Sequence, residues 1–206
     1  MNRPFPPKRL FDLEGLDSFE RAHDVEDWLY EVFVDYNSPL YGEEHEHLED
    51  AGIGVLWSTA SVVRKGIAIA GTAELAKPKN SLGQLEKKIW MWQQRQWFGD
   101  DPLHFRITLD ANYAMECEDV DFCALVKHEL CHCAQALNKY GDKWFRKDGS
   151  RVFTLIGHDV EEFIPVVRDF GPVGRNVKEF VAAASAPPRI AQAHIARMCG
   201  TVARAA

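Results

Sequence analysis

The sequence predicts an α+β fold in which a small mixed sheet packs against one helix that carries two histidines. Short β-prone runs at 53–57 and 66–70, and an alternating apolar and polar run at 105–109, are typical of strands. Residues 119–140 instead repeat apolar side chains every three or four positions, which is typical of a helix with one buried face. With 206 residues, the chain is long enough to bury a core on its own.

Composition and charge exclude several classes of protein. Hydrophobic residues make up 46% of the chain and charged residues 27%, which rules out a disordered or collagen-like chain. The formal net charge of -7 argues against nonspecific nucleic-acid binding, because neutralising phosphates needs an excess of Lys and Arg. No apolar run approaches the roughly 18 residues of a membrane span, and no secretory signal is visible. We therefore expect a cytoplasmic protein whose cysteines stay reduced.

The N-terminal part is expected to form a helix followed by a hairpin. Asp17 or Ser18 can cap a helix, because apolar residues recur at helical spacing after them, and this helix is expected to end at 37–39. The β-prone runs at 53–57 and 66–70 are short and lie close together in the sequence. Their arrangement is consistent with a β-hairpin.

The segment before the alternating strand is compatible with two structures. Ser81 and Gln84 have capping-box spacing and predict the start of a helix. The aromatic-rich run at 90–98 either continues that helix or forms a strand, and the residues do not decide between the two. The run at 105–109 is expected to be a half-buried strand.

The second half of the chain begins with the most regular helical pattern. Gly141 follows the predicted helix 119–140 at the position where a C′ glycine belongs. Residues 144–157 are expected to form a hairpin with Asp148-Gly149 as its turn, and a last helical element leads to Gly171-Pro172.

These patterns divide the chain into three parts. We expect an N-terminal helical segment at 1–39, a central domain at 40–181 and an Ala-rich basic tail at 182–206. The tail has no acidic residue and is expected to be either a packed terminal helix or a mobile arm. Its basic residues are Arg189, Arg197 and Arg204.

The motif that carries chemistry is His128-Glu129-Leu130-Cys131-His132, an H-E-x-x-H pattern inside the predicted helix. Residues four apart share one helix face, so both imidazoles can reach one Zn²⁺. Glu129 is rotated by about 100° from His128, which lets its carboxylate approach a metal-bound water as a general base. Imidazole ligands favour zinc, while Mn, Co and Ni stay compatible with the ligand type.

A catalytic zinc needs a third protein ligand and an open position for water. The downstream segment offers His158, Glu161 and Glu162 as candidates. His158 ends a predicted strand, and the two glutamates begin the next helix. Asp159 and Glu162 also have capping-box-like spacing, which gives Glu162 an alternative role at a helix N-terminus.

Other histidines and cysteines have plainer interpretations. His45 and His47 lie in a strongly acidic stretch, which indicates a solvated helix face rather than a second metal site. Cys131 and Cys133 flank His132, and on a helix both would point away from the histidine pair. We expect them to be buried, inert thiols.

At these residues the chain resembles the phage metallopeptidase family, relatives of the SprT-like zincins of phages and prophages. The resemblance extends from roughly Leu40 to Gly171 and includes a strand pair near Val55 and Gly71, the strand 105–109 followed by Tyr113, the H-E-x-x-H helix and the segment 157–163. It implies a zincin-like fold, a zinc ion and hydrolysis of peptide bonds. SprT-like proteins use a histidine before a helix as third ligand, which supports His158. The interval from His132 to His158 is longer than in the compact SprT-like pattern, which keeps Glu161 open.

The resulting prediction is a zinc metallopeptidase that acts on a peptide or protein substrate. Glu129 would take a proton from a metal-activated water and deliver it to the leaving amine. The strand 105–109 would hold an extended substrate as a sheet edge. Candidates for the group that stabilises the oxyanion are Tyr113, Tyr140 and Arg168.

Two other functions compete with this prediction. The first is a zinc-stabilised regulatory or host-interaction protein without turnover, which would have a closed fourth coordination position. The second is a DNA-associated protease of the SprT-like kind. The acidic balance of the chain disfavours DNA binding, whereas the basic tail could supply a local contact.

Overall fold

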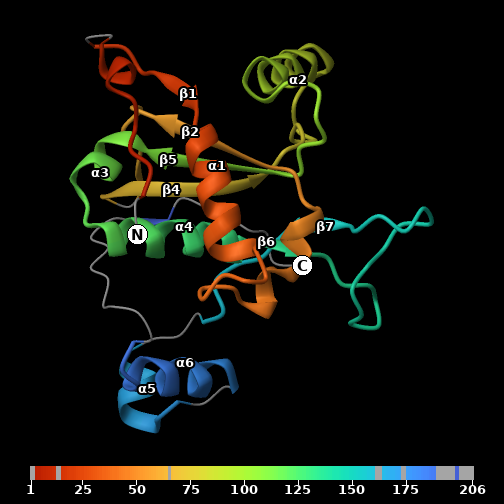
Figure 1. Ribbon diagram of the computed structural model, residues 1–206. Helices are drawn as coiled ribbons and strands as arrows, with labels where there is room; N and C mark the ends of the chain where they lie inside the picture. The colour runs from red at the N-terminus through yellow and green to blue at the C-terminus, as the bar shows by residue number, and fades with distance from the viewer. Residues whose placement is uncertain are drawn as a thin grey trace.

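The computed structural model describes residues 3–12, 15–64, 66–160, 164–172, 175–188 and 198–199. Its centre is a mixed sheet in the order β1-β2-β5-β4-β3, with β8 pairing to β4 (Figure 1). The strands β2 and β5 are parallel, whereas β1 is antiparallel to β2 and β4 is antiparallel to β5. The bounds are β1 Phe19–Arg21, β2 Ile53–Ser58, β3 Val63–Arg64, β4 Ile67–Leu75, β5 Phe105–Asp110 and β8 Met198–Cys199.

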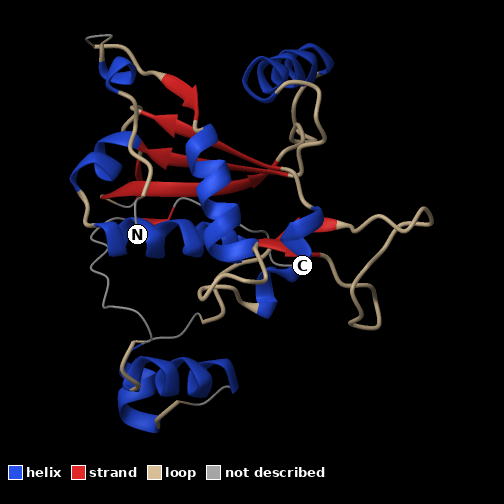
Figure 2. Cartoon of the chain, viewed as in Figure 1, coloured by secondary structure: helices blue, strands red, loops and turns tan. Residues whose placement is uncertain are grey.

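Some helices pack against this sheet and others lie apart from it, and a second, two-stranded sheet lies beside it (Figure 2). The α-helices are α1 His23–Leu29, α2 Gln84–Phe98, α3 Ala111–Glu116, α4 Asp119–His132, α5 Ile164–Phe170 and α6 Arg175–Ser185. Shorter helical turns are η1 Lys8–Phe11, η2 Tyr30–Val34 and η3 Glu43–Asp50, and the small sheet pairs β6 Cys133–Gln135 with β7 Phe153–Leu155. The prediction of an α+β fold with a small mixed sheet is therefore confirmed. Among the described residues, no helix is both long and apolar enough to cross a membrane.

The main core joins the sheet to α1 and α4. Phe122 of α4 lies between Trp57 of β2 and Trp28 of α1, with ring centroids 5.9 Å and 5.6 Å away. Such tilted aromatic contacts bury large apolar area and contribute beyond that area. Alternation along β5 adds Phe105, Ile107 and Leu109, all fully buried. These contacts fix α4 against the sheet.

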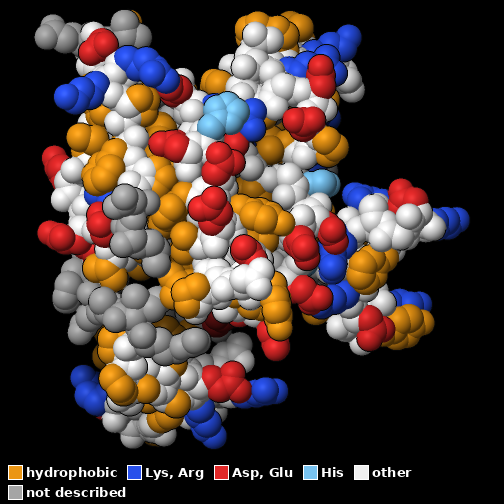
Figure 3. Space-filling view, viewed as in Figure 1, with side chains coloured by type: hydrophobic (Ala, Val, Ile, Leu, Met, Phe, Trp, Pro, Cys, Tyr) orange, Lys and Arg blue, Asp and Glu red, His pale blue; other side chains and the backbone are white. Residues whose placement is uncertain are grey.

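The opposite face of β2 is covered by the end of α2. Gly54 lies so close to the Phe98 ring that a Cβ would clash with it, so a glycine is needed at this crossing. The outer face of α2 is apolar and open to solvent, with Leu85 71% and Trp92 60% exposed (Figure 3). This helix therefore contacts the sheet mainly through its last turn and its inner face.

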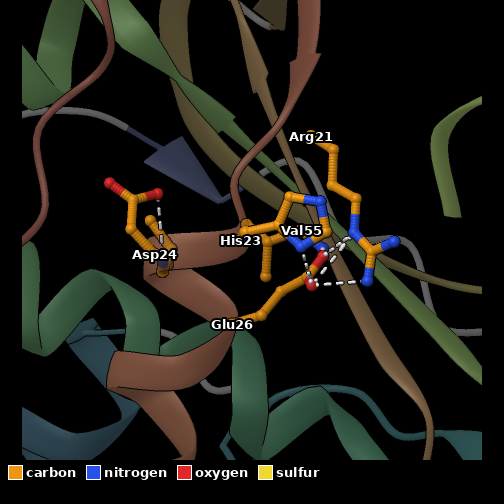
Figure 4. A network of polar contacts seen from close by, with 6 residues as sticks. Arg21, His23, Asp24, Glu26 and Val55 are labelled. Carbon is orange, nitrogen blue, oxygen red and sulfur yellow. Dashed lines mark hydrogen bonds and ion pairs between the residues drawn. The ribbon is translucent and has the colours of Figure 1, made fainter.

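A polar network ties the start of α1 to the sheet (Figure 4). Arg21 donates two hydrogen bonds to the Glu26 carboxylate, from Nε at 3.1 Å and from Nη2 at 2.8 Å. The same carboxylate accepts the backbone N–H of Val55 at 2.8 Å. Because β1 ends at Arg21, this carboxylate satisfies an amide of β2 that no longer has a strand partner.

The first helix starts later than its sequence predicts. Residues 19–21 form β1, which pairs with 56–58 of β2, so the prediction of a helix from Asp17 or Ser18 is wrong in its start. The helix begins at His23 instead. Pairing with β2 satisfies the backbone groups that a helix would otherwise have used.

The predicted hairpin between 53–57 and 66–70 is also wrong. These runs become β2 and β4, and β5 lies between them. The chain forms its short hairpin from β3 and β4. Parallel pairing of β2 with β5 needs a long crossover, which β3, β4 and α2 supply. The run at 90–98 continues α2 to Phe98, so its helical alternative is the correct one.

The predicted helix 119–140 ends at His132. Cys133–Gln135 leave the helix and pair with β7, and Gly141 adopts φ 90° in a turn rather than serving as a helix C′ residue. Within 144–157 the turn at Asp148-Gly149 is confirmed by a bridge between Phe145 and Arg151, whereas 153–155 pair with β6. The last predicted helical element is confirmed as α5, which ends before Gly171.

Candidate metal centre

Two of the three histidines come from the last turn of α4. His128 and His132 are four residues apart on this helix, and their Nε2 atoms lie 3.3 Å from each other. The helix places them on one face, as the i, i+4 spacing predicts. The prediction that the H-E-x-x-H motif lies on a helix is thus confirmed.

The third histidine reaches the site through the β6–β7 pair. Cys133 pairs with Leu155, and the ladder continues one step further, where the N–H of Ile156 donates to the carbonyl of His132 at 3.0 Å. His158 follows two residues later, and its Nε2 lies 3.2 Å from Nε2 of His128. The ligand atoms of all three histidines lie within 4.8 Å of one another.

Hydrogen bonding fixes the tautomer of His132. Its Nδ1 lies 2.7 Å from the carbonyl oxygen of Ile156. A carbonyl only accepts, so Nδ1 must carry the proton and donate it. The Nε2 lone pair of the neutral ring therefore faces the other two histidines, which is the usual arrangement of a metal-binding histidine.

Electrostatics favour the neutral form of His128. The pKa of His128 is lowered to about 4, first because burial penalises its charged form and then because His132 and His158 would repel a positive ring. At pH 7 this imidazole therefore offers a lone pair rather than a proton. Metal binding requires that neutral form.

The three residues fit a zinc ion. Two nitrogens bound to one tetrahedral zinc at 2.0–2.1 Å lie about 3.3 Å apart, close to the observed Nε2 separations of 3.3 Å and 3.2 Å. A set of three imidazoles without carboxylates suits zinc better than Mg or Ca. His158 is exposed, so the cluster is reachable from solvent.

Glu129 lies next to the cluster and is fully buried. Its carboxyl group packs beneath Gly71 of β4, where an added Cβ would lie 3.0 Å from Oε1 and 3.1 Å from Cγ. The absence of a side chain at Gly71 makes room for the carboxylate between helix and sheet. Glu129 follows Val126 by three positions and precedes Cys133 by four, and all three are buried, so Glu129 points inward with these apolar neighbours.

The structure describes only some of the other predicted candidates. Glu161 and Glu162 fall outside the described residues, so their role as alternative ligands stays a prediction. Tyr113 is buried on α3, Tyr140 is exposed in a turn, and Arg168 pairs with the neighbouring Asp169. The assignment of an oxyanion-stabilising residue therefore also stays a prediction.

The interpretation of His45 and His47 as a solvated helix face is wrong. Both lie on η3 and are buried, with 1% and 9% of their surface exposed. His47 donates from Nε2 to the carbonyl of Cys133 at 2.7 Å, which supports the end of α4 just beyond the motif. One feature of the sequence indicates that this acidic segment packs inward. It is Leu48, the only aliphatic residue among residues 43–50.

The flanking cysteines differ from each other. Cys133 is buried, as predicted, and burial raises its pKa well above the usual range. The prediction that Cys131 is buried is wrong, because its side chain is exposed. Its sulfur lies 3.7 Å from Nε2 of His45, so it belongs to the contact between α4 and η3.

Comparison with known proteins identifies the family. The model of a family described as putative phage metallopeptidase matches residues 17–185, a range that contains α4, the β6–β7 pair and His158. No curated protein and no solved structure matches the chain. The name of the family implies a metal-dependent peptidase, in agreement with the histidine cluster. Because the match covers most of the sequence, the chain belongs to the phage metallopeptidase family.

Proposed function

We propose that this protein is a zinc-dependent peptidase whose metal is held by His128, His132 and His158. The observation that carries the proposal is the convergence of three imidazole nitrogens, within 4.8 Å of one another, beside the buried Glu129. When bound, zinc supplies Lewis-acid activation of a water molecule and of the scissile carbonyl. The exposure of His158 supports an open coordination position and thus favours catalysis over a closed structural site.

Glu129 is the proposed general base and acid. Glu129 lies between His128 and His132 on α4, so its carboxylate would lie beside a water activated by a zinc ion that these histidines held. The carboxylate would accept a proton from that water and deliver it to the leaving amine, so that it ends the cycle as it began. Gly71 and α4 hold the carboxylate in place, which limits the reorganisation that the reaction needs.

The sheet topology excludes β5 as the edge strand that would hold a substrate. An extended peptide needs a sheet edge with free backbone groups, and β5 lies between β2 and β4. The prediction that 105–109 serves as the edge strand is therefore wrong. β4 carries Gly71, against which the side chain of the proposed base packs.

The experiment that tests this function uses fluorescently labelled casein, with the wild type and Glu129→Gln both loaded with zinc. We expect the wild type to release fluorescent fragments and the variant to do so about 10²- to 10⁴-fold more slowly, because general acid–base catalysis contributes that much. Both proteins should bind zinc equally, since the amide replaces no ligand. An unchanged rate in the variant would exclude Glu129 as the base.

The two alternative functions make different predictions. A regulatory zinc protein would show no casein cleavage by the wild type while it still bound zinc. A DNA-associated protease would depend on the basic tail, whose Arg189, Arg197 and Arg204 lie outside the described residues. No contact among the described residues favours either function over hydrolysis.

A further inference from the structure

A projecting arm, residues 136–152, joins β6 to β7 at the right of Figure 1. At its base the N–H of Ala136 donates to the carbonyl of Val152 at 2.7 Å. Beyond this base the chain forms two successive loops, at 137–143 and 145–151, and an antiparallel bridge closes each of them. The arm is thus held by its own backbone hydrogen bonds, and most of its side chains are open to solvent.

The arm extends from the two strands that adjoin the histidines of the candidate site. His132 immediately precedes β6, and His158 follows the last residue of β7 by three positions. The base of the arm is four residues from His132, which is about 13 Å along an extended strand. A polypeptide held at the metal centre therefore reaches the arm when it extends about four residues or more beyond the scissile bond.

The arm is basic, although the whole chain has a net charge of -7. Residues 137–151 contain five Lys and Arg residues and two Asp residues. Both aspartates bind groups of their own loops, because Asp142 accepts from Nδ2 of Asn138 at 3.4 Å and Asp148 accepts from the N–H of Ser150 at 3.0 Å. The excess of positive charge favours a ligand of negative charge.

Carboxylates already bind part of this arm. Lys143 pairs with Glu46 of η3 at 2.8 Å, and Arg151 pairs with Asp50 of η3 at 2.7 Å. Two exposed lysines of the arm form no ion pair with any residue that the structure describes, and they are Lys139 and Lys147. These two cations are available to the carboxylates of another chain.

Aromatic side chains lie exposed on the same arm. Tyr140 is 77% exposed, Trp144 is 50% exposed and Phe145 is 46% exposed. Aromatic residues are enriched in protein interfaces, where they bury large apolar area. Hydrophobic and basic side chains gather over this arm at the right of Figure 3. The arm therefore offers apolar contacts in addition to its charges.

We propose that the arm is a docking site for acidic segments of the polypeptides that the metal centre cleaves. This inference rests on the proposed function and names its substrate class: chains with Asp or Glu and an apolar residue about four residues or more from the scissile bond. A polypeptide is favoured over a nucleic acid because the arm adjoins the candidate site of a peptidase family and because the chain is acidic overall.

The binding test uses full-length protein supplied with zinc, with Glu129→Gln in every sample to prevent cleavage of the probe. The probe is a short fluorescein-labelled peptide of glutamate and phenylalanine, followed by fluorescence anisotropy. Lys139→Glu with Lys147→Glu reverses two charges of the arm. Lys79→Glu with Lys88→Glu is the matched control, because these lysines are also exposed, lie outside the arm and form no ion pair within the described part of the chain.

We expect the charge reversal in the arm to weaken binding of the probe about tenfold, because two attractive ion pairs become repulsive. The control pair should leave binding unchanged, and added NaCl should weaken it. A peptide with glutamine in place of every glutamate should bind both proteins equally weakly. Equal binding of the glutamate peptide by the arm variant and the control would overturn the docking site. Tighter binding of oligothymidylate than of this peptide would overturn the polypeptide as occupant.

A second variant tests the aromatic part of the arm. Trp144→Ala should weaken binding of the probe at least about fivefold, the loss expected when an aromatic anchor is removed. Trp92→Ala is the matched control, because Trp92 is 60% exposed on α2. Unchanged binding by Trp144→Ala would overturn the aromatic contribution. If this variant is less stable in thermal unfolding, the lysine variants still decide whether the arm binds acidic peptide.

A cleavage assay separates this proposal from the proposed function. With zinc, labelled casein, which is acidic, and Glu129 restored, Lys139→Glu with Lys147→Glu should raise KM about tenfold and leave kcat unchanged. Docking away from the reacting atoms stabilises the bound substrate and the transition state equally. An unchanged KM would overturn the role of the arm in substrate binding. If the wild type does not cleave casein, the peptidase function fails, and the anisotropy of the Glu129→Gln proteins still decides whether the arm binds acidic polypeptide.

Discussion

The side chain of Glu129 packs closely against Gly71 of β4. The space above Gly71 is taken by Oε1 and Cγ of Glu129 and by Cδ1 of Leu125, all within 3.2 Å of an ideal Cβ. A strand interior usually favours larger residues, so a glycine there signals the close approach of another group. This signal was present in the sequence, but the sequence did not show which group approaches.

Gly71→Ala is expected to displace the Glu129 carboxylate by a few tenths of an ångström. Overpacking of this kind costs about 1–3 kcal/mol of folding free energy, and turnover should fall while zinc content stays unchanged. Thermal unfolding, casein cleavage and metal analysis measure the three quantities. Gly157→Ala is the matched control, because no atom lies within 4 Å of a Cβ there. A Gly71→Ala protein with normal stability and turnover would contradict this view of the contact.

Residue spacing predicted part of the site and left part open. His128, Glu129 and His132 follow from a local rule, because a helix brings i and i+4 together. His158 depends on the register of β6 against β7, and register is set by long-range pairing that spacing alone does not reveal. The resemblance to a family supported His158, but the sequence still left Glu161 open as an alternative. The structure brings His158 to His128 and does not describe Glu161.

At the scale of elements, the end of α4 is the feature that the sequence could not predict. Apolar residues continue at helical spacing to Leu137 and Tyr140, yet these two are 61% and 77% exposed. Hydrophobic periodicity cannot tell a helix from the strand that follows it when both contribute apolar residues. Pairing with β7 ends the helix, and η3 supports the junction through His47.

The buried η3 makes stability depend on pH through His45. Burial lowers the pKa of His45 to about 4 in the folded protein, from 6.5. Below pH 6.5 the unfolded chain therefore binds a proton that the folded chain does not, so stability falls as pH drops from 6.5 toward 4. The loss due to this residue is about 2 kcal/mol at pH 5.

Urea unfolding of the metal-free protein at pH 7 and pH 5 measures this effect. His45→Gln should lose about 2 kcal/mol less than the wild type between the two pH values, because glutamine does not titrate. His23→Gln is the control, since His23 is largely exposed at its side chain. The same loss in the wild type and in His45→Gln would show that His45 is not responsible.

At the scale of the whole molecule, the candidate site connects segments that are distant in sequence. α4 is held against the sheet by Trp57 and Phe122, whereas His158 arrives from beyond β7. An ion bound by all three histidines would bind the folded chain and not the unfolded one. Metal binding would then stabilise the entire fold.

Thermal unfolding with zinc and with EDTA tests this linkage. Zinc at 100 times its dissociation constant should add about 2.7 kcal/mol to the free energy of unfolding, and EDTA should remove the gain. His158→Ala should show a much smaller shift between the two conditions. A wild-type Tm that is the same with zinc and with EDTA would contradict metal binding by the folded state.

The sequence predicted the α+β class and the strand runs that become β2, β4, β5 and β7, because periodicity is a local property. It did not predict that β5 lies between β2 and β4, because strand order depends on which faces can be buried together. For the same reason, the prediction that 105–109 forms an edge strand was wrong. The alternating pattern at 105–109 reports which face of the strand is buried and says nothing of its two edges, which pair with β2 and β4.

The measurement that tests the three-histidine site most directly is metal content by elemental mass spectrometry on the purified wild type, His158→Ala, Glu161→Ala and His23→Ala. We predict one zinc per chain in the wild type, in Glu161→Ala and in the surface control His23→Ala, and a loss of zinc in His158→Ala. Zinc retained by His158→Ala and lost from Glu161→Ala would contradict the assigned third ligand. A wild type that binds no metal even after zinc is supplied would contradict the metal centre itself.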